Sequence, residues 1–344
     1  MQESRINNTI GNRLLLRHSA QIVLGIVFLC LFCVRCTSDK SSIEAFIPLD
    51  AAKEKAELIN LGRELFFDKK LSVDNSIACA NCHIPVLAFT DGDSVSIGFH
   101  GRKGKRNSPS LFNVVNQDLF MWDGGVKTLE LQALVPLQDT NEMAHRISEL
   151  IPELAKIPYY DSLAQLIDGK SFNPHLMTRA LGAFQRSLYR EESLFDRWQR
   201  GEKEVDASVE AGYELFTGRL NCASCHTPST FTNNALENNG LYETYKDQGR
   251  YLITGDSSDI GKFKVPSLRN VEITAPYMHD GSIKTLDDVV EHYRSGGAHH
   301  PNQSELIQGF ELSELEKKQL ISFLRSLSDE SIKKQWSKVF NTRY

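Results

Sequence analysis

Apolar residues recur at helical spacing along most of the chain, and runs of alternating β-branched residues are few. Two segments, "PELAKIPYYDSLAQL" and "PHLMTRALGAFQRSLYREESLFDRW", follow this helical spacing. Capping boxes open two further segments, with Thr285 and Asp288 in "TLDDVVEHYRSGG" and Ser313 and Glu316 near the chain end. The apolar face predicted for the last helix consists of Leu315, Ile321, Phe323, Leu324 and Leu327. The pattern predicts an all-α fold with a domain boundary near "RWQRGEKEVD".

The amino-terminal segment has a different pattern. Three arginines precede a run of fifteen uncharged residues from Ala20 to Val34, which is short for a bilayer-spanning helix and typical of a signal-peptide core. We therefore expect residues 1–36 to be a signal peptide or lipoprotein leader, and the protein to be exported to the periplasm or the outer surface. Lipoprotein cleavage would leave a lipidated Cys36, but Arg35 is a poor match to the small residue expected before it. Plain cleavage and a retained short anchor are the alternatives.

The cysteines define the candidate chemistry. Three of the seven lie near the leader, and the other four form "CANCH" at Cys79–His83 and "CASCH" at Cys222–His226. This spacing is used in zinc sites, in thioredoxin-like redox pairs and in thioether attachment of haem c. A four-thiolate zinc site would join pairs 143 residues apart and leave both histidines unused. Haem c uses every residue, because two thiols bind the porphyrin and the next imidazole binds the iron.

The sequence before each motif also repeats. "GRELFF" precedes the first motif and "GYELFTG" precedes the second, and both fit a short amphipathic helix that would pack on a closing helix. Leu65, Phe66, Leu215 and Phe216 are the predicted anchors. The repeat predicts two tandem class I cytochrome c-like domains, each with one covalently bound haem c. We expect the first domain at residues 44–200 and the second at residues 201–340.

The net charge limits the class of partner. The whole chain has a formal charge of −5, and the leader carries more basic than acidic residues, so the remainder is more acidic still. No basic stripe is left to neutralise phosphates, which argues against nucleic acid. An electron-donor protein with a basic docking patch is compatible with this charge.

Three longer motifs resemble one known family. They are "RNSPSLFNVVNQDLFMWDG", "LQALVPLQDTNEM" and "VPSLRNVEITAPYMHDGSIKTLDDVVEHY". In order and spacing they are similar to the bacterial dihaem cytochrome c peroxidases and their MauG branch, and the resemblance covers about Ala52 to Leu327. It implies that the first haem reacts with hydrogen peroxide and that the second passes electrons. It also implies a small electron donor, such as a monohaem cytochrome c or a cupredoxin, and a possible homodimer.

The resemblance assigns roles to particular residues. His83 and His226 would be the proximal iron ligands, and Glu142 would be the distal acid–base group, although alone it would read as a solvated loop carboxylate. Pro136 would shape the same pocket. Trp122 would lie between the haems, a role compatible with an ordinary core position.

A cation site is also implied by the resemblance. The side chain of Asn107 and the backbone carbonyls of Thr274 and Pro276 match the family's calcium ligands. Oxygen ligands of this kind suit a hard cation.

His100 lies in a glycine-rich loop near the place of a histidine that caps the first iron in resting classical members. A one-residue gap in the alignment leaves two interpretations of the role of His100. His100 is either a distal ligand of the first iron or an exposed histidine on a mobile basic loop.

The distal ligand of the second iron has two candidates. Met278 is the natural choice from residue type, because thioethers are common ligands in cytochromes. The resemblance instead places Tyr293 at the ligand position, as in the MauG branch, with His292 a weaker candidate. A phenolate would lower the potential of the second haem. His279 and Arg269 are candidates to bond haem propionates.

Together these features predict a peroxidase that reduces hydrogen peroxide to water. A MauG-like oxidase of a protein substrate and a non-enzymatic dihaem electron carrier are the alternatives.

Overall fold

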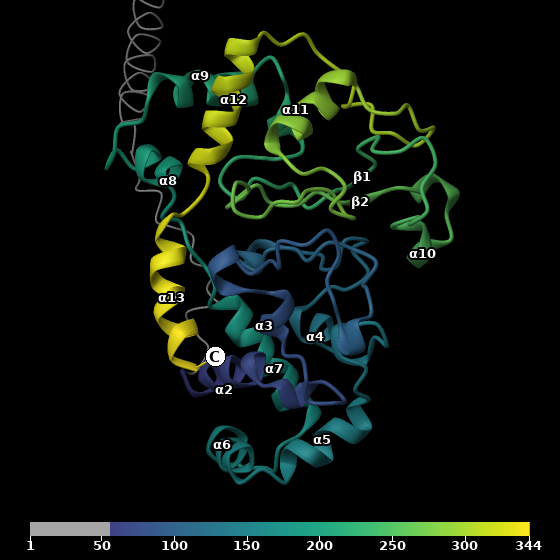
Figure 1. Ribbon diagram of the computed structural model, residues 1–344, viewed down its shortest axis with the longest axis vertical. Helices are drawn as coiled ribbons and strands as arrows, with labels where there is room; N and C mark the ends of the chain where they lie inside the picture. The colour runs from purple at the N-terminus through teal and green to yellow at the C-terminus, as the bar shows by residue number, and fades with distance from the viewer. Residues whose placement is uncertain (1–55, 344) are drawn as a thin grey trace, which may run out of the picture. The chain divides into compact units, whose positions relative to one another are not determined.

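Each half of the chain is built around a pair of packed helices. In the computed structural model, which describes residues 56–343, α2 (Ala56–Phe67) packs on α7 (Pro174–Arg186), and α9 (Ala207–Thr217) packs on α12 (Glu314–Ser326) (Figure 1). The approach is close in both pairs: a side chain at Gly62 would collide with the Ala180 carbonyl, and one at Gly212 with the Gln319 carbonyl. The predicted anchor helices therefore pack on their closing helices as expected.

Short elements connect these pairs. The remaining helices are α3 (Cys79–Cys82), α4 (Leu129–Gln138), α5 (Ile147–Ala155), α6 (Pro158–Asp168), α8 (Leu194–Gln199), α10 (Tyr251–Thr254), α11 (Leu286–Ser295) and α13 (Ser331–Arg343). Two-residue strands β1 (Leu236–Glu237) and β2 (Phe263–Lys264) pair antiparallel, with Leu236 opposite Lys264. The described residues all belong to one compact unit, Ile47–Tyr344, and the predicted leader lies outside them. No helix within residues 56–343 is long and apolar enough to cross a membrane.

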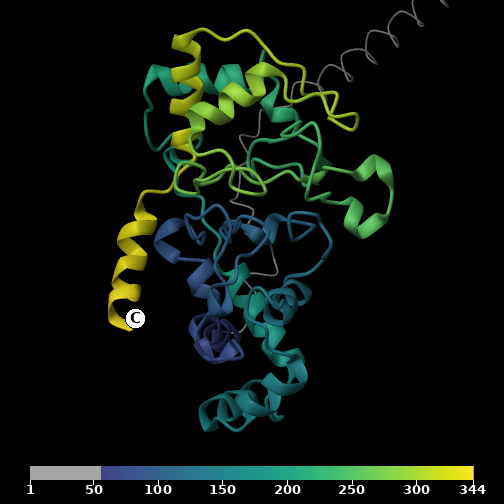
Figure 2. The ribbon, with the colours of Figure 1, turned by 45° about the vertical axis from the view of Figure 1, so that its right-hand side comes forward.

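Two hydrophobic cores give the chain two domains, and the fold is all-α as predicted. The N-terminal core includes Leu61, Leu65, Phe66, Phe89 and Phe184, all buried. The C-terminal core includes Phe195, Phe216, Phe231, Phe323 and Leu324. The last helix crosses from one domain to the other, because Ile332 of α13 is buried in the N-terminal core and Trp336 packs edge-on against Phe89 at 5.2 Å (Figure 2).

The helix predictions need three local corrections. The helical segment predicted at residues 152–166 belongs to two helices, α5 and α6, and Pro158 begins the second one because its fixed φ suits a first helical turn. The segment 174–198 is likewise interrupted between α7 and α8, where Ser193 starts a new capping box. Leu315, placed on the apolar face of α12, is 67% exposed, whereas Phe323 is fully buried. Both predicted capping residues, Thr285 and Ser313, do cap their helices.

The two domains meet through reciprocal main-chain hydrogen bonds. Asn107 N–H in the N-terminal domain donates to the His279 carbonyl, and Lys264 N–H in the C-terminal domain donates to the Trp122 carbonyl, both at 2.7 Å. The duplicated sequence explains this symmetry, since "NSPSLFNV" from Asn107 corresponds to "KVPSLRNV" from Lys264. Arg106 adds an ion pair with Asp247 at 2.6 Å across this contact surface between the two domains, which is called the seam below.

Candidate haem sites

The first Cys-x-x-Cys-His motif lines a pocket in the N-terminal domain. Cys79 and Cys82 begin and end the single turn of α3, and His83 caps that turn. The His83 Nδ1–H donates to the Phe89 carbonyl at 2.9 Å, which leaves Nε2 available to bind a metal. Both cysteines and the histidine line this pocket. Two thiols and a free imidazole nitrogen around one apolar pocket are the donor set that haem c requires.

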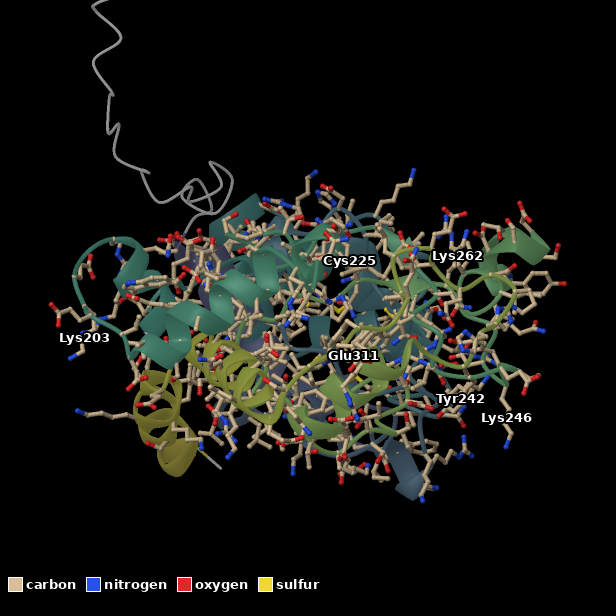
Figure 3. The ribbon with its side chains drawn as sticks, turned by 90° about the horizontal axis from the view of Figure 1, so that it is seen from above. Lys203, Cys225, Tyr242, Lys246, Lys262 and Glu311 are labelled. Carbon is tan, nitrogen blue, oxygen red and sulfur yellow. The ribbon has the colours of Figure 1, made fainter. Side chains whose placement is uncertain are left out.

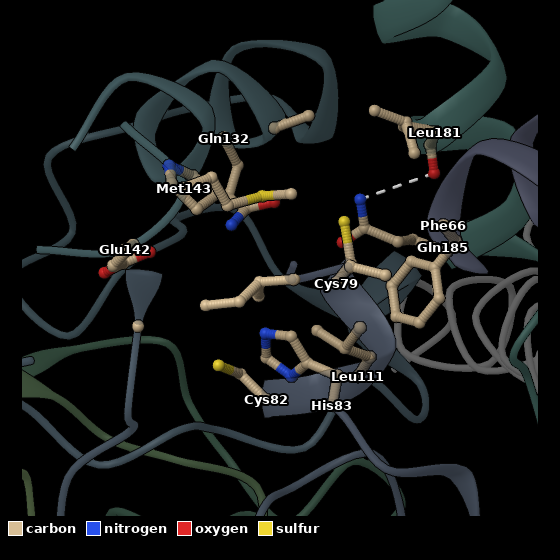
Figure 4. Close-up of a pocket in the computed structure, with 15 residues that line it drawn as sticks. Phe66, Cys79, Cys82, His83, Leu111, Gln132, Glu142, Met143, Leu181 and Gln185 are labelled. Carbon is tan, nitrogen blue, oxygen red and sulfur yellow. Dashed lines mark hydrogen bonds between the residues drawn. The ribbon is translucent and has the colours of Figure 1, made fainter. Parts of the chain in front are cut away.

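The far wall of this pocket comes from α4 and the loop after it. Gln132, Ala133 and Pro136 of α4 line it, together with Glu142 and Met143. Figure 4 shows Cys82 and His83 at one side of the pocket and Gln132 and Met143 at the other. The pocket thus has an attachment side and a separate side that carries polar groups.

Glu142 is held in place by its own backbone. Its N–H donates to the Asp139 carbonyl at 3.0 Å, and its carbonyl accepts from the Phe99 N–H at 2.8 Å. Burial, with a smaller contribution from the negative charge of Asp139, raises the pKa of Glu142 from 4.5 to about 7. A carboxyl with this pKa exchanges protons readily near neutral pH, as a general acid–base group must.

The thiols do not form a zinc site. Burial raises the pKa of Cys79 to about 12 and that of Cys82 to about 11, because an apolar pocket disfavours the thiolate. Among residues 56–343, no group of three or more His, Cys, Asp or Glu side chains is arranged to hold a metal ion. The zinc alternative, which needs both cysteine pairs together, therefore does not agree with the structure.

The second motif has the same local design. Cys222–Ser224 forms one 3-10 turn, and the Nδ1–H of His226 lies 3.1 Å from both the Phe231 and the Pro266 carbonyl oxygens. Burial raises the pKa of Cys222 to about 12. The imidazole is again fixed by one ring nitrogen while the other is available to an iron.

Tyr293 on α11 faces this second motif. Burial raises its pKa to about 12, and a hydrogen bond from the Asn239 side chain opposes that rise. The thiols of Cys225 and Cys222 lie close enough to interact with it electrostatically. The Met278 sulfur, the other candidate ligand atom, already accepts a hydrogen bond from Asn239 Nδ2 at 3.2 Å. The His292 Nε2–H likewise donates a hydrogen bond to the Asn239 carbonyl at 3.0 Å. Asn239 therefore contacts all three candidate distal ligands, a role that the sequence did not indicate.

The other predicted residues lie around the seam between the domains. The Trp122 indole N–H donates to the Asn107 carbonyl at 2.8 Å.

The Asn107 side-chain amide donates to the Asp93 carbonyl at 2.9 Å. Asp93 and Pro276 line a second pocket of about 520 Å³, and Lys284 lines it too. The Thr274 hydroxyl donates to the Val271 carbonyl at 3.3 Å. Calcium at this place stays a prediction.

His100 lies away from the first pocket. Its side chain is 67% exposed, and its Nε2 is 3.6 Å from the Asp74 carboxylate. Gly98 of the same loop lines the pocket instead, packed against the backbone of Asn141 and Glu142. This placement agrees with the reading of His100 as an exposed loop histidine.

Arg269 and His279, the two propionate candidates, differ in how they are held. All three Arg269 guanidinium nitrogens donate within the chain, to both Asp196 oxygens at 2.9 Å and to the Ser229 carbonyl. The His279 ring is buried and stacks on Phe263, with ring centroids 3.8 Å apart. The protein therefore uses Arg269 as a structural ion pair.

Comparisons with known proteins agree with this geometry. Residues 56–204 match the di-haem cytochrome c peroxidase family, and residues 209–328 match the cytochrome c family. The methylamine utilization protein MauG of Methylorubrum extorquens is 36% identical over 279 residues, which cover 80% of this chain and 79% of that protein. The cytochrome-c peroxidase IdrP1 of Denitromonas iodatirespirans is 33% identical over 310 residues, which cover 79% of this chain and 82% of that protein.

This chain belongs to the dihaem cytochrome c peroxidase and MauG family. A solved structure of a MauG-like protein associated with microbial copper homeostasis has a TM-score of 0.77 at 32% identity, covering 83% of this chain and 93% of that chain. Two cytochrome c-type domains mean two haem c groups. Since relatives include both MauG proteins and peroxidases, family membership by itself does not choose between these activities.

Proposed function

We propose that this protein is an exported dihaem cytochrome c peroxidase, which reduces hydrogen peroxide to water with electrons that arrive through the C-terminal haem. The observation that carries the proposal is the carboxyl of Glu142, with a pKa of about 7, in the same pocket as Cys79, Cys82 and His83. An electron carrier needs no such group, whereas peroxide reduction needs proton movement between two oxygens.

The chain's own residues would divide the work as follows. Cys79 and Cys82 would attach the first haem, Cys222 and Cys225 the second, and His83 and His226 would bind the two irons. When bound in these sites, the haem groups would supply the redox chemistry for cleavage of the O–O bond. The Glu142 carboxylate would accept a proton from one peroxide oxygen and return it to the other, which leaves as water. Two electrons and two protons convert each peroxide into two water molecules.

The surrounding residues would support this proton movement. Pro136 and Ala133 form an apolar wall of α4 in the pocket that Glu142 lines, and this limits competing water. Trp122 would link the two haems, since its carbonyl and indole bond to residues on both sides of the seam: Lys264 in one domain and Asn107 in the other. The donor would be a small electron-transfer protein, such as a monohaem cytochrome c or a cupredoxin. Calcium held by Asn107, Thr274 and Pro276 would stabilise this seam.

A MauG-like oxidase is the second candidate, and Tyr293 favours it. Its buried phenol lies close to Cys222 and Cys225 of the second motif. An anionic oxygen ligand favours oxidised iron, so such a haem would share oxidising equivalents more readily than it would wait for an electron.

Electron paramagnetic resonance of the oxidised holoprotein, before and after one equivalent of peroxide, tests the proposal. The exposed position of His100 leads us to expect a high-spin first haem that reacts with peroxide without prior reduction. Turnover with a reduced cytochrome c would then support the peroxidase, and simultaneous loss of both ferric signals without turnover would support the MauG-like oxidase. Two low-spin haems that ignore peroxide in every redox state would overturn both and leave an electron carrier.

A further inference from the structure

Lys264 is a largely buried lysine, and no residue within 56–343 pairs with its ammonium group. It is the last residue of β2, and only 8% of its surface is exposed. Its ammonium group makes no hydrogen bond or ion pair with any described residue, and burial alone lowers its pKa from 10.5 to about 8. A charged group held largely out of water without a counter-charge is costly, so a lysine at this position favours an anion that residues 56–343 do not supply.

The other cations near the seam have partners within the chain. Arg106 bonds Asp247 through Nε at 2.6 Å and Asp123 through Nη1 at 2.6 Å. Lys284 donates to the Gly281 carbonyl at 2.7 Å and to the Ser94 hydroxyl. Lys262, two residues before Lys264, pairs with Asp259 at 3.1 Å. Lys264 differs from these neighbours in being both more buried and unpaired.

The backbone at and after Lys264 forms hydrogen bonds with residues of both domains. Its N–H donates to the Trp122 carbonyl at 2.7 Å, and Pro266, two residues later, offers its carbonyl to the His226 imidazole at 3.1 Å. Successive side chains of a strand point to opposite faces. The Phe263 ring stacks on His279 and lies under the Arg106 guanidinium at 5.7 Å, so the Lys264 side chain points away from that stack.

A haem c group brings two carboxylates of its own, on its propionate side chains. We propose that Lys264 binds a haem propionate at the seam between the two domains and holds that carboxylate ionised. The ammonium group then has the counter-charge that the described part of the chain does not give it. This inference rests on the two haem c groups and is independent of whether the protein acts as a peroxidase or as an oxidase.

Redox titration of Lys264→Met in the holoprotein tests this role without peroxide. Methionine keeps the length of the side chain and removes the charge. Losing a positive charge beside a haem favours its oxidised form, so we expect one haem to become at least tenfold harder to reduce, a fall of 59 mV for one electron. Lys264→Arg, which keeps the charge, should stay near the parent potential. The matched control is Lys262→Met, which removes a nearby paired lysine (Figure 3).

The result that would overturn the inference is a Lys264→Met protein whose two potentials both equal those of Lys262→Met. If Lys264→Met does not retain haem, resonance Raman spectra of the parent holoprotein decide the question. A propionate bonded to an ammonium group has a bending mode that shifts when exchangeable protons are replaced by deuterium, and we expect that shift. Propionate modes that do not respond to deuterium would refute the contact. Neither measurement depends on peroxide turnover, so a failure here is distinct from a failure of the proposed function.

Discussion

Replacing Glu142 with glutamine tests the proposed proton transfer most directly. Glutamine preserves the size of the side chain but can neither accept nor release a proton. The folded protein raises the pKa of Glu142 from 4.5 to about 7, which corresponds to about 3 kcal/mol against the ionised form. A position that served only as a surface carboxylate would not hold its proton so strongly.

The expected loss follows from the usual contribution of general acid–base catalysis. We expect Glu142→Gln to react with peroxide about 10² to 10⁴ times more slowly than the parent, with unchanged haem content. Stopped-flow absorbance of the oxidised holoprotein after mixing with peroxide measures this rate.

The pH dependence of the reaction rate with peroxide shows which protonation state of Glu142 is active. The ionised carboxylate accepts the first proton, so the parent rate should rise with pH, level off above about 7, and fall about tenfold for each unit below it. The negative charge of Asp139 contributes to the raised pKa, so Asp139→Asn should move this inflection to lower pH while keeping the plateau rate. Glu142→Gln should have no inflection. Equal rates in Glu142→Gln and the parent would refute the assignment of Glu142.

Three further predictions concern other parts of the molecule. Tyr293→Met should raise the potential of the C-terminal haem, because a thioether stabilises reduced iron better than a phenolate does, and an unchanged redox titration would remove Tyr293 as a ligand. Gly212→Ala should destabilise the C-terminal domain by about 1–3 kcal/mol, since the new methyl group would meet the Gln319 carbonyl, and denaturant unfolding that matches the parent would contradict this close approach. Arg106→Met should cost about 3–5 kcal/mol by leaving the Asp247 carboxylate without its partner, and its effect should appear as a lower thermal midpoint at neutral pH.

Local sequence was enough for the covalent chemistry and for the main helices. Two Cys-x-x-Cys-His motifs specify their haem c sites within five residues each, because one turn of chain brings both thiols and the imidazole together. Helix caps such as Ser313 act within three residues, so they too can be read from the sequence. The interruptions at Pro158 and Ser193 were missed because an apolar periodicity continues across them.

The properties of Glu142, His100 and Lys264 depend on contacts that no local pattern describes. From the sequence alone, Glu142 would be interpreted as a solvated loop carboxylate, and its pKa is raised mainly by burial in the pocket. The sequence left two interpretations of His100, and its 67% exposed side chain favours the exposed loop histidine. The burial of Lys264 arises where residues more than 140 positions apart meet at the seam. Attachment chemistry follows from bonds between neighbours in sequence, whereas protonation and charge balance follow from exclusion of water, which only the assembled tertiary structure produces.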